Sequence, residues 1–164
     1  MNWDALAAIS DLVSAAGVIV SLIYVAGQIR QGTMQTSLNT KAIQATAYQN
    51  LLDQHSKISL QIATTPEIRK VLIKARTERL ADFNEDERLL YSSYMQQHMR
   101  SVYSGFHLRE RGLIGEDEWI SFATSIDRVA ERRAFDDWWQ ERKNSFPPSF
   151  IGAVEARWKS ARLT

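Results

Sequence analysis

Residues 5–29 read ALAAISDLVSAAGVIVSLIYVAGQI, and this stretch decides how the rest of the chain is interpreted. Its only charged residue is Asp11, and its other polar positions are serines, a tyrosine and a glutamine. A helix rises about 1.5 Å per residue, so this stretch is long enough to cross the hydrocarbon core of a bilayer, which is about 30 Å thick. The sequence therefore predicts one transmembrane helix within residues 1–30.

Asp11 is the costly residue of the predicted span. A carboxylate at the centre of a membrane helix costs about 2.5 to 3.5 kcal/mol on the insertion scale. The aliphatic residues of the stretch contribute roughly −3 to −6 kcal/mol in total on the same scale, so a central Asp nearly cancels insertion. We therefore expect Asp11 to lie near the outer interface, or to face water or a protein partner.

The charges around the span predict its orientation. Asp4 and Asp11 are the only charged residues before Arg30, and all 20 Lys and Arg residues lie from Arg30 onward. Because Lys and Arg favour the cytoplasmic side, we expect the N-terminus outside and the rest of the chain in the cytoplasm. The first residues lack the basic region of a secretory signal peptide, so we expect the helix to be retained.

Small and polar residues form one line along the predicted membrane helix. They recur at steps of four and three, which places them on one helical face. Membrane helices associate through such faces, because close packing and interhelical hydrogen bonds replace the hydrophobic drive. We expect self-association through this association seam, and the alternative is a single anchor whose serines bond back to their own helix. The association seam consists of Ala7, Asp11, Ser14, Val18, Ser21, Val25 and Gln28.

The chain after the span has a helical pattern throughout. Residues 31–64 contain no proline and keep a roughly helical apolar spacing, so we expect a stalk that continues the first helix and bends at Gly32. Residues 65–164 are long enough for one cytoplasmic domain with its own core. No strand pattern or internal repeat is present, so the predicted fold is all-α, with a compact bundle of about five helices after the stalk. The expected helices of the domain cover 66–80, 85–112, 116–129, 131–143 and 149–163.

Two kinds of side chain stand out in the predicted domain. Large aromatic residues recur on the apolar faces of its helices, and burying them closes a small helical core. The expected core aromatics are Trp119, Trp138, Trp139, Phe150 and Trp158. Basic residues near the span and on the first domain helix are candidates for contact with lipid head groups, although such residues are more often a solvated face. These candidates are Arg30, Arg69, Lys70 and Lys74.

Composition and motifs argue against several function classes. The formal net charge is only +1 and the charges are evenly mixed, so we expect no nucleic-acid partner. The chain has no cysteine, no phosphate-binding glycine loop and no serine-hydrolase signature. Asp136 and Asp137 are neighbours on a helix and point about 100° apart, so they do not form an acid–base pair. We therefore expect no catalytic residue, no cofactor and no enzymatic activity.

The histidines do not form a metal motif. His98 and His107 are nine residues apart, which places them on opposite sides of a helix. Neither they nor His55 falls in an arrangement typical of zinc sites. Because His98 lies on an apolar stripe, we expect it to be a structural residue with its hydrogen bonds satisfied.

Several blocks of the sequence occur together in a known set of proteins. They are LIYVAGQIRQ at residues 22–31, GLI at 112–114 before Trp119, the pair Trp138-Trp139, and Ser145-Phe146 with Phe150. In these blocks the chain resembles a widespread family of short, uncharacterised bacterial proteins with one N-terminal transmembrane helix and a small helical domain. The resemblance covers nearly the whole chain. It implies this architecture and a location in the bacterial inner membrane, and it implies no activity.

Three functions fit these observations. We expect a membrane-anchored, non-enzymatic interaction or assembly protein, whose partners are the lipid bilayer and a second copy of itself or another membrane protein. The first alternative is an accessory subunit of a larger membrane complex. The second alternative is a small oligomeric pore, because rings of polar side chains at Asp11, Ser14, Ser21 and Gln28 resemble those that line channels.

Overall fold

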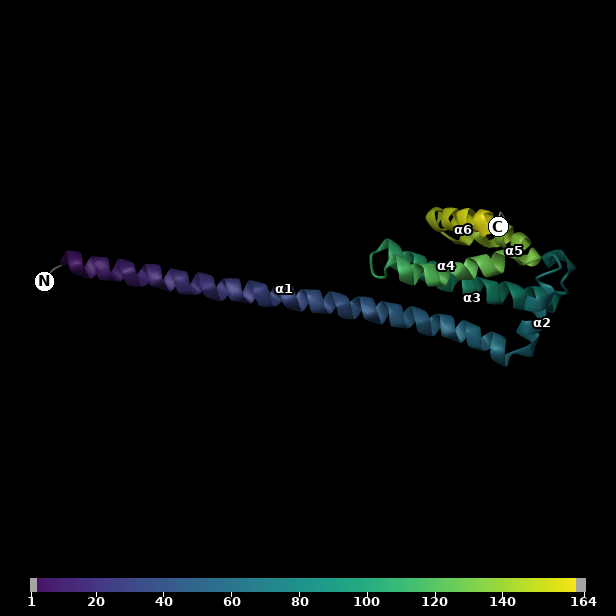
Figure 1. Cartoon of the computed structure of the whole chain (residues 1–164), viewed down its shortest axis with the longest axis horizontal. Helices are drawn as coiled ribbons and strands as arrows, with labels where there is room; N and C mark the ends of the chain where they lie inside the picture. Colours follow the sequence, from purple (N-terminus) through teal and green to yellow (C-terminus); the bar gives the residue numbers. More distant parts are fainter. Residues whose placement is uncertain (1–2, 162–164) are drawn as a thin grey trace. The chain divides into compact units, whose positions relative to one another are not determined.

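The computed structural model describes the backbone of residues 3–161, and the side chains of residue 14 and residues 16–160. Over these residues the secondary structure is helical and contains no strand, so the all-α part of the predicted fold is confirmed (Figure 1). Two of the helices are short 3₁₀ turns, η1 and η2. The helices in chain order are α1 (Trp3–Thr64), α2 (Pro66–Lys74), η1 (Leu80–Asp82), α3 (Glu85–Glu110), α4 (Glu116–Ala130), α5 (Arg133–Arg142), η2 (Lys143–Ser145) and α6 (Pro148–Ala161).

The first helix belongs to two compact units. α1 is continuous over 62 residues and passes Gly32 without interruption. The chain divides into residues 1–43 and residues 44–164. The second unit begins inside α1, because Leu51 and Ile58 are only 3% and 1% exposed and belong to the core of the domain. This division differs from the predicted one, in which the stalk reached residue 64.

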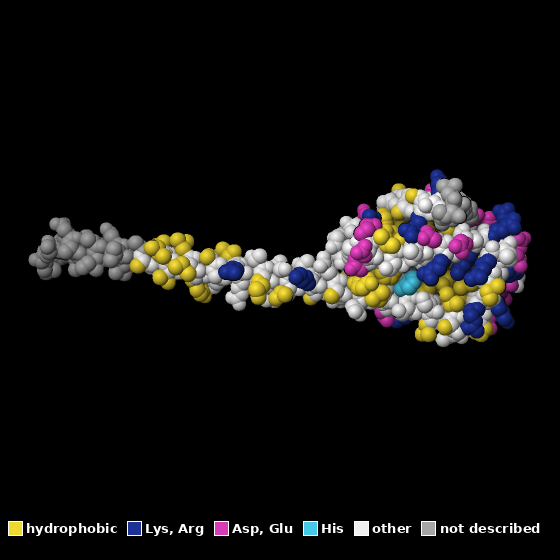
Figure 2. All heavy atoms as spheres, in the orientation of Figure 1, with side chains coloured by type: hydrophobic (Ala, Val, Ile, Leu, Met, Phe, Trp, Pro, Cys, Tyr) yellow, Lys and Arg dark blue, Asp and Glu magenta, His cyan; other side chains and the backbone are white. Residues whose placement is uncertain are grey.

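The first unit exposes its apolar side chains. Every described residue from 16 to 43 is exposed, and Figure 2 shows hydrophobic side chains along this part of α1. No helix is long and apolar enough to cross a membrane when only the described residues are considered. The predicted span over residues 5–29 lies partly outside them, because the side chains of residues 5–13 and of residue 15 are not described.

The second unit has a core built on aromatic rings. Trp138 and Trp139 of α5 are fully buried, and each stacks with Phe135, with ring centroids 6.1 and 5.9 Å apart. The indole N–H of Trp138 donates to the Ser92 hydroxyl of α3 at 3.1 Å, so its polar atom is also satisfied. Of the expected core aromatics, four are buried and Trp158 is half-buried; the four are Trp119, Trp138, Trp139 and Phe150.

Local sequence signals set both ends of α3. At the start of α3 the side chain of Asn84 accepts the N–H of Glu87 at 2.9 Å, and the Glu87 carboxylate accepts the N–H of Asn84 at 3.0 Å. These two reciprocal hydrogen bonds form a capping box. α3 ends just before Gly112, whose φ of +66° is the left-handed conformation that glycine adopts without strain. The structure therefore confirms both predicted ends to within two residues.

α2 is shorter than the predicted helix over 66–80, and a distant segment ends it. In a longer helix the Ala75 carbonyl would accept the N–H of Arg79, but it accepts the N–H of Ala134 at 3.1 Å instead. The Arg79 guanidinium donates to the Asp137 carboxylate at 2.7 Å, and the N–H of Leu80 donates to the same carboxylate at 3.1 Å. Asp137 thus fixes the connection after α2.

Candidate functional site

Three helices of the second unit enclose a small basic cavity. The cavity has a volume of about 120 Å³, and its lining comes from α1, α3, α4 and the connection after α4. It brings His55 of α1 and His98 of α3 together, with ring centroids 6.0 Å apart. Its polar lining includes His55, Tyr94, His98, Ser125, Arg128 and Arg132, and none of its lining residues is acidic.

His98 is the buried titratable residue of this cavity. Its side chain is 6% exposed, and its ring lies parallel to the Tyr94 ring at 6.1 Å. Burial lowers the pKa of His98 most, and the positive charges of His55, Arg132 and Arg128 act in the same direction, so that together they bring it from 6.5 to about 3. The imidazole is therefore neutral at physiological pH.

The hydrogen bonds of His98 are not satisfied. The Ser125 backbone favours the charged imidazole, but its geometry falls short of a hydrogen bond, and neither ring nitrogen has a partner. The prediction that His98 is a satisfied structural residue is therefore wrong. The physical reason is that packing removes water from the imidazole without bringing a partner into hydrogen-bonding geometry with either ring nitrogen.

Arg132 carries the main positive charge of the cavity. It immediately precedes α5 and is half-buried, and its Nη1 atom has no hydrogen-bond partner. Burial lowers the pKa of Arg132, and Arg76 and Arg128 lower it as well by like-charge repulsion. A guanidinium stays protonated in proteins despite such a shift. Arg132 is thus a charged group in a partly desolvated site, and two other arginines act on it.

A second cavity shares residues with the basic cavity. It has a volume of about 300 Å³ and is lined by Ile62, Leu72, Ile73 and three arginines, one of which is Arg132. Ile62 and Arg132 line both cavities. Figure 2 shows a histidine side chain on this domain beside a row of Lys and Arg side chains. Because Ile62, Leu72 and Ile73 line the second cavity together with Arg132, it offers apolar space beside that residue.

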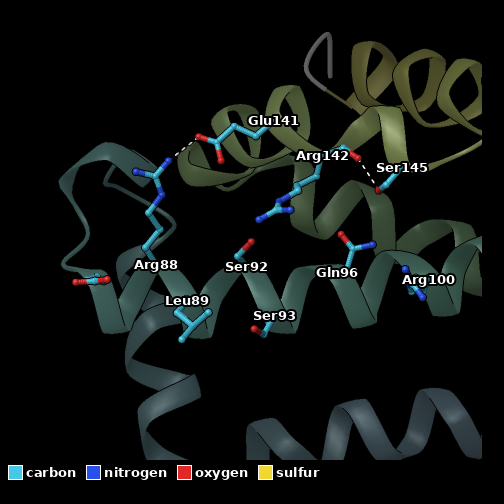
Figure 3. A pocket seen from close by; sticks show the side chains of 10 residues that line it. Arg88, Leu89, Ser92, Ser93, Gln96, Arg100, Glu141, Arg142 and Ser145 are labelled. Atoms are coloured by element: carbon cyan, nitrogen blue, oxygen red, sulfur yellow. Dashed lines mark hydrogen bonds and ion pairs between the residues drawn. The ribbon is translucent and has the colours of Figure 1, made fainter.

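A larger concave region than the basic cavity is a groove between α3 and α5. It has a volume of about 600 Å³, and its lining includes Arg88, Ser92 and Gln96 of α3 and Glu141 and Arg142 of α5 (Figure 3). Arg88 pairs with Glu141 at 2.7 Å, and Ser92 accepts the Trp138 indole N–H. None of the residues that line this groove has a buried side-chain polar atom without a hydrogen-bond partner, in contrast to the basic cavity.

The predicted association seam lies in the first unit. Ser14, Val18, Ser21, Val25 and Gln28 are exposed, whereas the side chains of Ala7 and Asp11 lie outside the described residues. The Ser21 hydroxyl donates to the Gly17 carbonyl of its own helix at 2.8 Å. This contact matches the alternative reading for Ser21, in which a serine bonds back to its own helix.

The four predicted lipid-contact residues differ in their surroundings. Arg30 and Lys70 are exposed. Arg69 donates to backbone carbonyls in the last turn of α1, at Ile62 and Ala63. Lys74 forms an ion pair with Glu87 at 2.6 Å and lies over the Phe83 ring. Arg69 and Lys74 therefore already have contacts within the domain, and the assignment of all four residues to lipid head groups stays a prediction.

Neither metal ligation nor similarity to known proteins identifies the site. Within the described residues, no group of three or more His, Asp or Glu side chains is placed to hold a metal ion. Comparison of the chain with known protein families, with curated proteins and with solved structures found no match. The resemblance to short bacterial membrane proteins therefore stays a prediction.

The sequence contains one local signal for the basic cavity. Arg128 and Arg132 are four residues apart beside the buried positions Val129 and Ala130. That spacing places two guanidinium groups on one side of a helix end. Pairing His55 with His98 needs the tertiary structure, because 43 residues separate them.

Proposed function

We propose that this protein is a membrane-anchored, non-enzymatic interaction or assembly protein that places the helical domain of residues 44–164 at a membrane surface. One observation supports the proposal most directly: α1 carries large aliphatic side chains on all sides, and they are exposed. Their exposed fractions range from 47% at Val25 to 69% at Ile23. The set comprises Val18, Ile19, Val20, Leu22, Ile23, Val25 and Ile29.

The exposed aliphatic side chains of this helix are expected to be buried against a bilayer or another protein. Fully burying a Val, Leu or Ile side chain stabilises by roughly 1.5 to 3 kcal/mol, so leaving several of them in water is costly. A helix that is apolar all round is buried either in a bilayer or in a larger protein core. The bilayer is the better match for two reasons. The apolar stretch of residues 5–29 has the length of a membrane span. The basic residue Arg30 follows it directly, and basic residues favour the cytoplasmic end of a span.

The same helix supports self-association. The association seam presents small and polar side chains, which let two membrane helices approach closely. The bond from Ser21 to Gly17 satisfies the serine hydroxyl within its own helix, so close packing rather than a hydrogen bond from Ser21 would hold the two helices together. A second copy of this chain is the partner that this seam fits best.

Membrane fractionation of the full chain tests the anchor. We expect the wild type to remain in the membrane pellet after alkaline carbonate extraction. Replacing Leu22 and Ile23 by Asp puts two charges in the proposed span and should release the chain. Replacing Met34 and Leu38 by Asp is the matched control, because these residues are equally exposed but lie outside the span. Recovery of wild-type protein in the soluble fraction would refute the anchor.

Crosslinking in the same membranes tests the seam. We expect the wild type to form crosslinked dimers or higher oligomers of itself, and the double variant Ser14→Leu plus Ser21→Leu to form fewer. Unchanged crosslinking of the double variant excludes this seam. A constant companion protein in place of self-crosslinks favours the accessory-subunit alternative.

A further inference from the structure

The basic cavity has a charge imbalance that the rest of the domain does not show. Elsewhere in the described domain, buried or half-buried cations meet carboxylates: Arg157 pairs with Asp127 at 2.8 Å, and Lys143 pairs with Glu155 at 3.0 Å. Arg132 has no such ion pair among the described residues, and the charged side chains that act on its pKa are Arg76 and Arg128. Buried charges in proteins are normally paired, because an unpaired one loses its hydration without compensation.

The cavity also contains unused hydrogen-bonding groups. The Nη1 of Arg132 and both ring nitrogens of His98 lack partners, and both residues line the cavity. Arg132 and a neutral imidazole each supply N–H donors. A ligand that satisfies the Arg132 guanidinium and the N–H of His98 must accept hydrogen bonds, and a negative charge on it would offset the cationic lining.

We propose that the basic cavity binds a compact oxyanion, a carboxylate or phosphate group, with Arg132 as its main ligand, His98 as a second hydrogen-bond donor and Arg128 at the entrance. The planar guanidinium of Arg matches the paired oxygens of both groups. Arg128 is exposed, so it lies where an incoming anion first meets the cavity. His55 completes the basic lining from α1.

The volumes limit the size of the ligand. A cavity of about 150 Å³ accommodates benzene, so 120 Å³ suits an anion of a few heavy atoms. The second cavity, beside Arg132, adds about 300 Å³ next to Ile62, Leu72 and Ile73. An organic carboxylate can therefore place its head group on Arg132 and a short apolar tail in the second cavity. A free phosphate uses only the basic cavity.

Binding has a signature at His98. The groups that face His98 are His55 from α1, Tyr94 from its own helix, Arg128 from α4 and Arg132 from the connection before α5. The positive groups among them disfavour a charged imidazole. A bound anion offsets these charges, so the pKa of His98 rises on binding.

The test uses the full chain in mild detergent and three probes: inorganic phosphate, acetate and hexanoate, at constant ionic strength set with chloride. The His98 imidazole resonances are followed by NMR, and calorimetry gives the affinity. We expect saturable binding of at least one probe, together with a raised pKa of His98. Arg132→Gln should weaken that binding at least tenfold. Arg100→Gln is the matched control, because Arg100 is exposed and lines the groove of Figure 3 instead.

The outcomes separate the ligand sources. Tighter binding of hexanoate than of acetate indicates a ligand with an apolar tail, and binding of phosphate alone indicates a free anion. Arg132→Lys keeps the charge without the planar fork and provides a second variant if Arg132→Gln does not fold. The proposal is overturned if no probe shifts His98 saturably in the wild type, or if the Arg132 variants bind as tightly as Arg100→Gln.

Discussion

His98 connects burial to the pH dependence of stability. The pKa of this histidine is about 3 in the folded chain, against 6.5 for an ordinary histidine. Between these values the unfolded chain binds a proton that the folded chain does not, so stability falls as the pH drops from 6.5 toward 3. Burial and Arg128 lower the pKa of His55 as well, so it acts in the same direction.

We predict that removing His98 flattens this dependence. A single titrating group changes the free energy of unfolding by at most about 1.4 kcal/mol per pH unit, and His98→Gln should remove roughly 1 kcal/mol per unit of slope between pH 6 and 4. Urea unfolding in buffers poor in phosphate and carboxylate measures it. His107→Gln is the control, since His107 is exposed. An unchanged slope in His98→Gln contradicts the assigned titration.

At the scale of single elements, the Glu87 carboxylate at the start of α3 takes part in two interactions. Glu87 closes the capping box with Asn84 and also pairs with Lys74 of α2 at 2.6 Å. The pairing lowers the pKa of Glu87, chiefly through its hydrogen bond with Lys74. Glu87 therefore positions α3 and also holds α2 against it.

We predict that the cap matters more than the charge. Asn84→Ala removes the acceptor for a helix N–H and should lower the free energy of unfolding by about 0.5 to 2 kcal/mol. Glu87→Gln keeps an acceptor at the cap but removes the charge that faces Lys74, so its loss should be smaller. Chemical denaturation of both variants gives the comparison. A larger loss in Glu87→Gln than in Asn84→Ala would reverse this assignment.

For the whole molecule, the division after residue 43 predicts where the chain can be cut. The first buried core residue in the chain is Leu51, and every residue from 16 to 43 is exposed. A fragment of residues 44–164 should therefore fold with the thermal midpoint of the domain in the full chain, and it should not bind membranes. Circular dichroism and flotation with vesicles measure both properties.

A shorter fragment provides the control for this cut. Residues 59–164 lack Leu51 and Ile58, and losing each large aliphatic side chain from a core costs about 2 to 5 kcal/mol. We expect this fragment to be unfolded or severely destabilised. If residues 44–164 also fail to fold, the domain needs the first unit, and the division is not a folding boundary.

The sequence by itself determined the all-α fold and most of its helices. Apolar periodicity, the capping box at Asn84 and the turn at Gly112 are local properties, since each depends on residues within a few positions. The burial of Trp138 and Trp139 was predictable for a similar reason, because so much apolar surface in a short helix must face a core.

Only the tertiary structure decided which helices meet. It extended the domain back to residue 44 within α1, and it ended α2 at Lys74 through contacts with Ala134 and Asp137. It also brought His55, His98 and Arg132 to one cavity. No local pattern encodes these contacts, because they join residues far apart in the chain, and the packing of the whole domain selects them.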